Sequence, residues 1–272
     1  MTGPERMKMA RIYVVTGAAS GIGHKTKEML EKHGHKVIGV DLAGTDVSGD
    51  LSTKEGRVAA AKAAAELAGG SVDAGIACAG LAHPIAKTVS VNYFGVTEFL
   101  EAIHPALTKS SAPRVSITSS MASLMPCDPA LVDAMLAGDE AAAVKRAQEL
   151  VDAGGGMEQL IYGSTKRAVS RWIRRECIKP EWAGAGIPLN AVGPGVVETP
   201  MTQDMIATDE ARQQMLQVVP MPLNGFMKPE TVADLLIWLA GESNTHVTGQ
   251  TVYIDGGSDA ALRGDNIWDL AK

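Results

Sequence analysis

The chain has 272 residues, of which 46% are hydrophobic, 21% charged and 4% aromatic. Its 29 glycines follow no G-X-Y repeat, which excludes collagen, and so large an apolar fraction excludes a disordered chain. A formal net charge of −6 argues against nucleic acid or an anionic membrane as a partner.

Short apolar runs alternate with helical segments along the chain. In chain order we expect a strand at Arg11–Thr16, a helix at Gly21–His33, a strand at Lys36–Asp41, a helix at Thr53–Leu67, a strand at Val72–Ala79, a helix at Ala86–Leu107, a strand at Arg114–Ser119, a helix at Gly163–Ile178, a strand at Ile187–Val192, a helix at Pro229–Leu239 and a strand at Gln250–Asp255. Continuous apolar strands that alternate with helices indicate parallel βαβ units. The sequence therefore predicts one α/β domain over residues 1–272, a single-domain Rossmann fold with a doubly wound parallel sheet.

One segment, at about 125–158, departs from this alternation. Two short helices are expected in it, at Asp128–Ala137 and Asp139–Ala153, and three glycines at 154–156 end the second one. We expect a helical insertion before the helix that carries Tyr162. The pattern leaves three roles open for it: a surface excursion, a substrate lid or an oligomer contact.

A glycine-rich turn follows the first strand and opens the first helix, with the sequence T-G-A-A-S-G-I-G at Thr16–Gly23. Free N–H groups and the helix dipole favour an anion at a helix N-terminus. Side chains at Gly17 or Gly21 would block the approach of a pyrophosphate, and Gly23 would let the helix pack closely on the strand. In this βαβ context the turn predicts a dinucleotide site.

Asp41 ends the second strand, 18 residues after Gly23. A carboxylate there can accept hydrogen bonds from adenosine ribose hydroxyls and would repel a 2′-phosphate. The next residue is Leu42 rather than a cation, so NAD is favoured over NADP as the cofactor. The alternative is a solvated aspartate at a strand end. Asp50 and Leu51 are weaker candidates for contact with the adenine.

Tyr162 and Lys166 lie four residues apart at the start of a helix, and therefore on one helix face. Free tyrosine has a pKa near 10, and a neighbouring cation lowers it by stabilising the phenolate. We therefore expect the lysine to make the tyrosine a workable acid and base for an alcohol or carbonyl oxygen.

These motifs together resemble the short-chain dehydrogenase/reductase family over essentially the whole chain. T-G-x-x-x-G-I-G, Y-x-x-x-K and P-G-x-x-x-T-P (Pro194–Pro200) occur in the family's order. The resemblance implies hydride transfer with Ser120 holding the substrate oxygen, Asn92 supporting a water-linked proton relay to Lys166, and Thr199 anchoring the nicotinamide carboxamide. With the turn above, it places the cofactor against Gly17, Ser20, Gly21, Ile22, Gly23, Asp41, Leu42, Asp50, Leu51, Cys78, Ala79, Gly80, Tyr162, Lys166, Pro194, Gly195, Val197 and Thr199.

The chain departs from the family pattern in three places. Where the family has N-N-A-G, this chain has A-C-A-G at Ala77–Gly80. The missing asparagines weaken the case for side-chain contacts with the cofactor there. Ser123 replaces a frequent glycine, and 42 positions separate Ser120 from Tyr162, far more than in most members. The long interval and the scaffold segments are similar to bacterial 3α-hydroxysteroid dehydrogenases/carbonyl reductases, with a coniferyl-alcohol dehydrogenase branch related.

The resemblance implies NAD-dependent interconversion of a secondary alcohol and a ketone, with a 3α-hydroxysteroid or similar hydrophobic cyclic alcohol as substrate. The segment at about 196–223, which is rich in Met and Val, is either a substrate lid or an ordinarily packed surface helix. The alternatives are a dehydrogenase of coniferyl-type aromatic alcohols and, more remotely, a non-catalytic NAD-sensing module. Tyr162→Phe separates catalysis from sensing.

The three cysteines (Cys78, Cys127 and Cys177) are far apart, and no Cys/His spacing is typical of zinc, so we expect no metal site. The charged segment Met1–Arg11 is not followed by the apolar region of a signal peptide, and no apolar stretch is long enough to span a bilayer. We expect a cytoplasmic protein without membrane or nucleic-acid partners. The resemblance implies a homodimer or homotetramer whose contacts can differ from the family's usual core-helix pairing.

Overall fold

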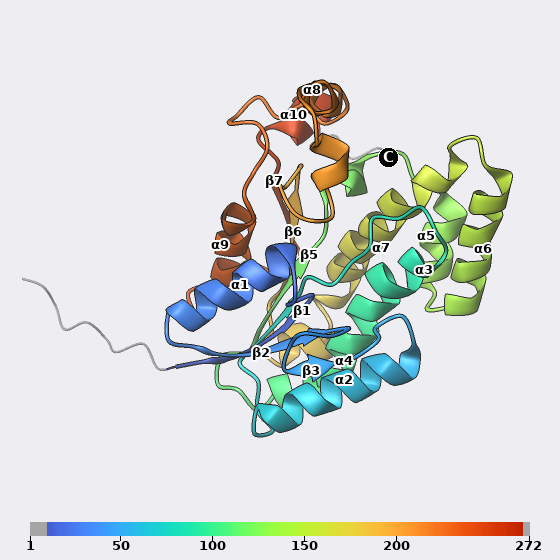
Figure 1. The fold of residues 1–272 in the computed structure, drawn as a ribbon. Coiled ribbons are helices and arrows are strands. Elements are labelled where there is room, and N and C mark those ends of the chain that lie inside the picture. Colours follow the sequence, from blue (N-terminus) through green and yellow to red (C-terminus); the bar gives the residue numbers. More distant parts are fainter. Residues whose placement is uncertain (1–9, 269–272) are drawn as a thin grey trace, which may run out of the picture.

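Seven parallel strands form the centre of the molecule, in the order β3-β2-β1-β4-β5-β6-β7 (Figure 1). This computed structural model describes residues 10–268, so the ends of the domain predicted over 1–272, and most of the Met1–Arg11 segment, lie outside the described residues. The strands are β1 Ile12–Thr16, β2 Lys36–Asp41, β3 Val47–Ser48, β4 Ala74–Ala77, β5 Arg114–Thr118, β6 Leu189–Pro194 and β7 Thr251–Ile254. The predicted doubly wound α/β sheet is confirmed.

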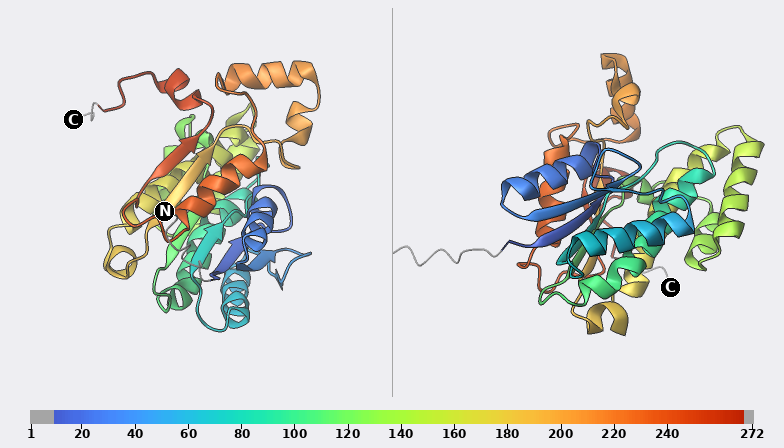
Figure 2. Two further views of the ribbon diagram at one scale, coloured as in Figure 1. Left: turned by 90° about the vertical axis from the view of Figure 1, so that its left-hand side faces the viewer. Right: turned by 60° about the horizontal axis from the view of Figure 1, so that its bottom comes forward.

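Helices cover both faces of the sheet (Figures 1 and 2). Their bounds are α1 Gly21–Lys32, α2 Lys54–Leu67, α3 Lys87–Val89, α4 Gly95–Leu107, α5 Pro129–Leu136, α6 Glu140–Ala153, α7 Leu160–Glu176, α8 Asp209–Val218, α9 Pro229–Leu239 and α10 Ser258–Arg263. One face packs against α1 and α9, and the other against α2, α4 and α7. No helix within residues 10–268 has the length and apolar character needed to cross a membrane.

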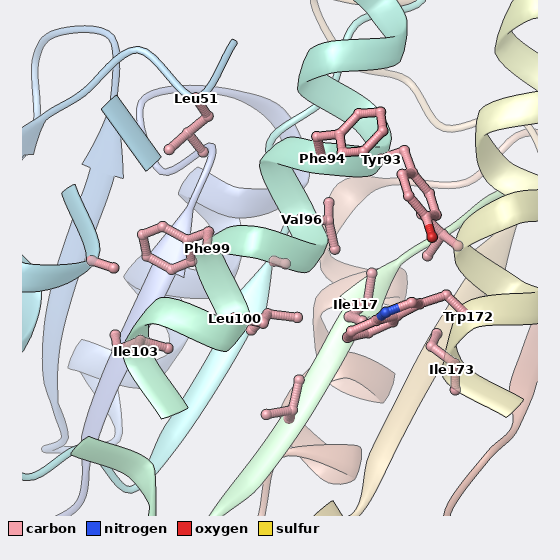
Figure 3. Packing of buried hydrophobic residues seen from close by; sticks show 14 of the residues in the cluster. Leu51, Tyr93, Phe94, Val96, Phe99, Leu100, Ile103, Ile117, Trp172 and Ile173 are labelled. Atoms are coloured by element: carbon pink, nitrogen blue, oxygen red, sulfur yellow. The ribbon is translucent and has the colours of Figure 1, made fainter. Parts of the chain in front are cut away.

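The larger core lies between the sheet and α4 and α7 (Figure 3). Phe99 and Leu100 on α4, Ile117 on β5 and Ile173 on α7 are at most 1% exposed. Each such side chain contributes about 1.5–3 kcal/mol of burial free energy. This core fixes the carboxyl ends of β4 and β5 relative to α7, which carries Tyr162 and Lys166.

Most predicted elements match the structure to within a few residues, and three differences go beyond that. β3 was not predicted, because its two residues are too few to show a pattern. The helix predicted at Ala86–Leu107 is broken by a π-helical turn at Ser90–Phe94. The helix predicted from Gly163 begins at Leu160, because a 3₁₀ turn at Met157–Gln159 leads directly into it.

The two predicted helices of the insertion are confirmed as α5 and α6, and the side chains of Asp128 and Asp139 cap their first turns. Six apolar side chains of the insertion are buried in the larger core: Leu131, Val132, Met135, Ala143, Ala147 and Leu150. α5 lies between α6 and α7 (Figure 1). The insertion thus packs against α7 through buried side chains and forms an additional layer at the side of the molecule (Figures 1 and 2).

Candidate active site

A cavity of about 430 Å³ lies at the carboxyl ends of the strands. Every residue that the sequence analysis placed against the cofactor lines it, and so does Ser120. The lining residues that sequence reasoning missed are Gly49, Leu81, Lys87, Val91, Thr118, Ser119, Pro200, Met201 and Thr202. Most of them are adjacent in sequence to a predicted site residue, so extending each motif by one residue would have found them.

The glycine turn owes its shape mainly to close backbone packing. A Cβ on Gly23 would lie 2.2 Å from the carbonyl oxygen of Gly17, so this glycine lets α1 start directly on the turn. Gly17 has a φ of +70°, and a Cβ there would lie 2.8 Å from the backbone nitrogen of Ala79. Gly17 therefore makes room for the segment after β4, a reason that the sequence did not reveal. At Gly21 the φ of +54° is the constraint, because a Cβ would meet only the Thr199 side chain at 3.6 Å.

The N-terminus of α1 suits a pyrophosphate. Ser20 makes no side-chain cap hydrogen bond, and the first turn holds no acidic residue. The first N–H groups of the helix therefore have no side-chain acceptor, and Gly21, Ile22 and Gly23 all line the cavity.

Asp41 ends β2 and joins the glycine turn to the far end of the cavity. Its carboxylate accepts hydrogen bonds from the backbone nitrogens of Ala19, at 3.0 Å, and Leu42, at 2.7 Å. No Lys or Arg forms a salt bridge with it within residues 10–268. The carboxylate thus stays available to neutral ribose hydroxyls, and its uncompensated charge opposes a phosphate.

Tyr162 and Lys166 stand on one face of α7, with the Lys166 Nζ 5.6 Å from the centroid of the Tyr162 ring. Nζ donates a hydrogen bond of 3.0 Å to the carbonyl oxygen of Thr118. Ser120 caps the 3₁₀ turn at Met121–Leu124 and accepts from the Ala122 nitrogen at 3.1 Å. Three side chains with the predicted chemistry therefore meet on one wall of the cavity.

The expectation that Lys166 lowers the pKa of Tyr162 is wrong. Desolvation by the surrounding protein raises the pKa of Tyr162 above its usual value, and the Ser120 hydroxyl, which hydrogen-bonds the phenol, is what opposes it. Lys166 does not contribute to this shift, and its own burial lowers its pKa to about 8. A shared helix face does not suffice to lower the pKa of Tyr162, because the Lys166 ammonium donates its hydrogen bond to the Thr118 carbonyl oxygen and not to the phenol.

Asn92 lies in the π-helical turn and is fully buried. Its Oδ1 accepts from the Leu81 nitrogen at 2.7 Å, and its Nδ2 donates to the Leu81 oxygen at 2.9 Å and to Thr165 Oγ1 at 3.2 Å. A Cβ on Gly80 would lie 3.3 Å from Asn92 Oδ1 and 3.7 Å from Lys166 Nζ. Asn92 thus braces the segment after β4 through Leu81, Gly80 lies near both Asn92 and Lys166, and the proton relay stays a prediction.

Two of the three departures from the family pattern, Cys78 and Ser123, have hydrogen-bond partners. The Cys78 thiol accepts a hydrogen bond from Thr118 Oγ1 at 3.2 Å, and burial raises its pKa to about 11, so the thiol is neutral. Ser123 Oγ lies 2.9 Å from the Tyr253 hydroxyl on β7. The backbone of the same turn is held by Arg167, whose Nε donates to the Ser123 oxygen at 2.7 Å. Arg167 and Tyr253 therefore position the turn that begins at Ser120. No sequence motif predicted this role for either residue.

A small apolar cluster lies beyond Ser120, formed by Met121, Val196, Ile206, Val219 and Met221. α8, in the segment predicted as a lid, buries none of its residues and stands away from the sheet (Figure 2). The Glu198 carboxylate accepts hydrogen bonds from Arg212 on α8 and from Lys228 before α9. The segment at about 196–223 is therefore held both by its own cluster residues and by the Glu198 ion pairs, while α8 within it has no fully buried residue.

Known proteins are similar to this chain over most of its length. The family described as enoyl-(acyl carrier protein) reductase matches residues 17–259. The chain is 34% identical over 257 residues to 3-alpha-hydroxysteroid dehydrogenase/carbonyl reductase of Comamonas testosteroni, covering 93% of this chain and 98% of that protein. It is 30% identical over 271 residues to cis-4-hydroxycyclohexanecarboxylate dehydrogenase of Sinomonas cyclohexanicum, covering 92% and 97%. The crystal structure of 3-alpha-hydroxysteroid dehydrogenase from Pseudomonas sp. B-0831 complexed with NADH matches with a TM-score of 0.83 and 37% identity, covering 93% and 98%.

Proposed function

The chain belongs to the short-chain dehydrogenase/reductase family and is an oxidoreductase of hydroxyl and carbonyl groups, and from this membership we propose that it interconverts a secondary alcohol and a ketone with NAD. The observation that carries the proposal is the meeting of Ser120, Tyr162 and Lys166 on one wall of a cavity whose far end holds Asp41. When bound, the nicotinamide supplies the hydride chemistry.

In this mechanism Tyr162 exchanges the proton of the substrate oxygen. The phenolate form of Tyr162 takes the hydroxyl proton during alcohol oxidation, and the phenol returns it during carbonyl reduction. Ser120 donates a hydrogen bond to the same oxygen and holds it in place. Lys166 also holds the nicotinamide ribose, and Asn92 supports proton exchange with solvent.

NAD is the proposed cofactor because of the charge at its adenosine end. Asp41 carries a carboxylate without a cationic partner in the described structure, and Leu42 next to it is 66% exposed. A 2′-phosphate in that position would meet a like charge. A related 3-alpha-hydroxysteroid dehydrogenase crystallised with NADH supports the same choice.

The proposed substrate is a 3α-hydroxysteroid or a similar hydrophobic cyclic alcohol. The segment at about 196–223 packs an apolar cluster against Met121, next to Ser120, which supports a hydrophobic substrate, and that segment is proposed to close over the substrate as a lid. The printed names of two relatives, a hydroxysteroid dehydrogenase and a hydroxycyclohexanecarboxylate dehydrogenase, both describe ring alcohols.

A substrate panel tests this proposal. The purified protein is assayed with NAD on 3α-hydroxysteroids, simple cyclic alcohols and cinnamyl-type alcohols, and NAD reduction is followed by absorbance. The highest kcat/KM is expected for a cyclic secondary alcohol. Preference for a cinnamyl-type primary alcohol would replace the proposed substrate by the coniferyl-type alternative, and no turnover of any alcohol with intact NADH binding would indicate a sensing module.

We also propose that the protein is a homodimer or homotetramer. α5 of the same chain lies against one side of α7, so that side is unavailable to a second subunit. The subunit contact is therefore expected elsewhere. Light scattering coupled to size-exclusion chromatography measures the mass, and a single species near 28.4 kDa would contradict the proposal.

A further inference from the structure

The most completely buried charged side chain among residues 10–268 lies outside the catalytic wall. Arg57 on α2 is 0% exposed and stands between two glutamates from different parts of the chain. Its Nη1 donates to Glu98 Oε2 on α4 at 3.0 Å and to Glu140 Oε2 on α6 at 2.7 Å. Its Nη2 donates to Glu140 Oε1 at 2.6 Å. Glu140 is the first residue of α6, so the insertion supplies one of the two carboxylates that pair with Arg57.

The same guanidinium also holds three backbone carbonyls. Its Nε donates to the Leu51 oxygen at 2.8 Å, and its Nη2 donates to the oxygens of Ser52, at 3.2 Å, and Ser90, at 3.0 Å. Leu51 lines the cavity, and so does Val91, the neighbour of Ser90. Arg57 therefore fixes two wall segments of the cavity without touching the cavity itself.

The wall at Asp50 and Leu51 cannot shift freely. A Cβ on Gly56 would lie 2.0 Å from the Asp50 oxygen, and a Cβ on Gly95 would lie 3.1 Å from the Leu51 oxygen. The first turns of α2 and α4 are thus closely packed against this loop. A displacement of Arg57 would therefore displace the loop backbone as well.

This wall belongs to the end of the cavity that holds Asp41. The Gly49 nitrogen donates to the Asp41 backbone oxygen at 2.8 Å, and Asp50 and Leu51 follow one and two residues further along the chain. In the proposed binding mode Asp41 takes the adenosine ribose, so the Asp50–Leu51 wall faces the adenosine half of NAD.

We propose that Glu140 of the helical insertion is a positioning residue for the adenosine half of the cofactor, acting through Arg57 on the cavity wall at Leu51 and Val91. The inference rests on the proposed NAD-dependent function. It gives the insertion a part in cofactor binding: Glu140 orients a planar guanidinium with five donors, and that guanidinium sets the position of the wall.

The test uses Glu140→Gln, with Glu149→Gln as the matched control. Glu149 lies on the same helix, pairs with Arg146 and is 49% exposed, so its substitution removes the same charge without reaching Arg57. NADH binding is measured by fluorescence titration, and ADP-ribose and reduced nicotinamide mononucleotide serve as probes of the two cofactor halves. Glu140→Gln is expected to raise the Kd for NADH and ADP-ribose about fivefold. Glu149→Gln should leave both unchanged.

The selectivity of the effect separates positioning from general loss of structure. For Glu140→Gln, kcat and the KM for the alcohol are expected to stay near the wild-type values, and so is turnover with reduced nicotinamide mononucleotide. Arg57→Lys should weaken ADP-ribose as well, because one ammonium cannot reach both glutamates and all three carbonyls. Unchanged ADP-ribose binding in a folded Glu140→Gln variant, or equal weakening of both cofactor halves, overturns the inference. Failure of the wild-type protein to bind NADH would instead refute the proposed function.

Discussion

Arg57 and Glu140 form a doubly hydrogen-bonded ion pair across 83 positions of the chain, with N–O distances of 2.7 and 2.6 Å. The pair joins α2 of the Rossmann scaffold to α6 of the insertion. A buried charge that loses its partner is strongly destabilising, so the pair keeps α6 in place. Together with the six buried apolar side chains of the insertion, it favours a fixed part of the scaffold over a moving lid.

This pair makes the stability of the protein depend on pH in the acid range. Burial of the Glu140 carboxyl favours its neutral form, but hydrogen bonds from Arg57 and Ser90 and the charge of Arg57 hold its pKa below the usual 4.5. The pKa is lower in the folded than in the unfolded chain. The contribution to stability is therefore complete above about pH 4.5 and is lost as the pH falls through the lower folded value.

Urea unfolding measures this contribution. Between about pH 5 and pH 3 the free energy of unfolding of the wild type should fall more steeply than that of Glu140→Gln, which carries no titrating group at this position. Glu149→Gln should follow the wild-type curve. Parallel curves for the wild type and Glu140→Gln would show that the carboxylate titrates alike in the folded and unfolded states.

Lys166 is expected to reduce stability at neutral pH. Its burial lowers its pKa from 10.5 to about 8, so below about pH 8 the folded protein bears the cost of a buried charge. Stability should rise from pH 8 to about pH 10.5, where the unfolded chain also loses the proton. Lys166→Met should raise the free energy of unfolding at pH 7 by about 1–2 kcal/mol, after loss of the hydrogen bond to Thr118, while abolishing turnover.

The check on Lys166→Met is urea unfolding at two pH values. The advantage of the variant over the wild type should shrink near pH 10. Lys62→Met serves as the control, because the Lys62 side chain is 77% exposed and should give no gain. A Lys166→Met protein less stable than the wild type at pH 7 would show that the ammonium is stabilised in the fold.

Gly23 is expected to be among the least replaceable glycines. In Gly23→Ala the new methyl group would lie 2.2 Å from the Gly17 carbonyl oxygen, and a backbone atom cannot move away cheaply. We expect a loss of about 3 kcal/mol in unfolding free energy. Gly184→Ala is the control, since its Cβ would meet only the Pro180 side chain at an ordinary 3.5 Å, and we expect a change within about 0.5 kcal/mol. Thermal unfolding that ranks the two variants in the opposite order contradicts the packing argument.

Asp41 should decide the choice between the two nicotinamide dinucleotides. Asp41→Ala removes the acceptors for the ribose hydroxyls and the repulsion of a 2′-phosphate, so the KM for NAD should rise about tenfold and the NAD/NADP ratio of kcat/KM should fall. Glu55→Ala removes the same charge from an exposed position near the start of α2 and should leave the ratio unchanged. Faster turnover of the wild type with NADPH than with NADH would refute the role of Asp41.

Local patterns in the sequence predicted the features that depend on neighbouring residues. The alternation of apolar runs and helices indicated six of the seven strands, and the glycine turn and the Tyr162–Lys166 spacing located one cavity. The glycines at 154–156 marked the end of the second insertion helix, because such a stop signal acts within a few residues.

Features that depend on distant residues were not predictable from these patterns. Arg57 looks like an ordinary charged helix residue until its partners, 41 and 83 positions away, are known. The pKa of Tyr162 depends on how completely the fold desolvates the phenol, which no spacing reveals. The close approach of Gly17 to Ala79 likewise exists only once β1 and β4 lie side by side.

The account depends most on Tyr162 as the acid and base, and the activity of Tyr162→Phe tests it most directly. The substitution removes one hydroxyl, so kcat should fall roughly 10³-fold while the Kd for NADH stays within about twofold of the wild type. Tyr13→Phe, which removes a hydroxyl from a buried tyrosine on β1 that does not line the cavity, should retain full activity. Wild-type turnover in a folded Tyr162→Phe protein would contradict the proposed mechanism.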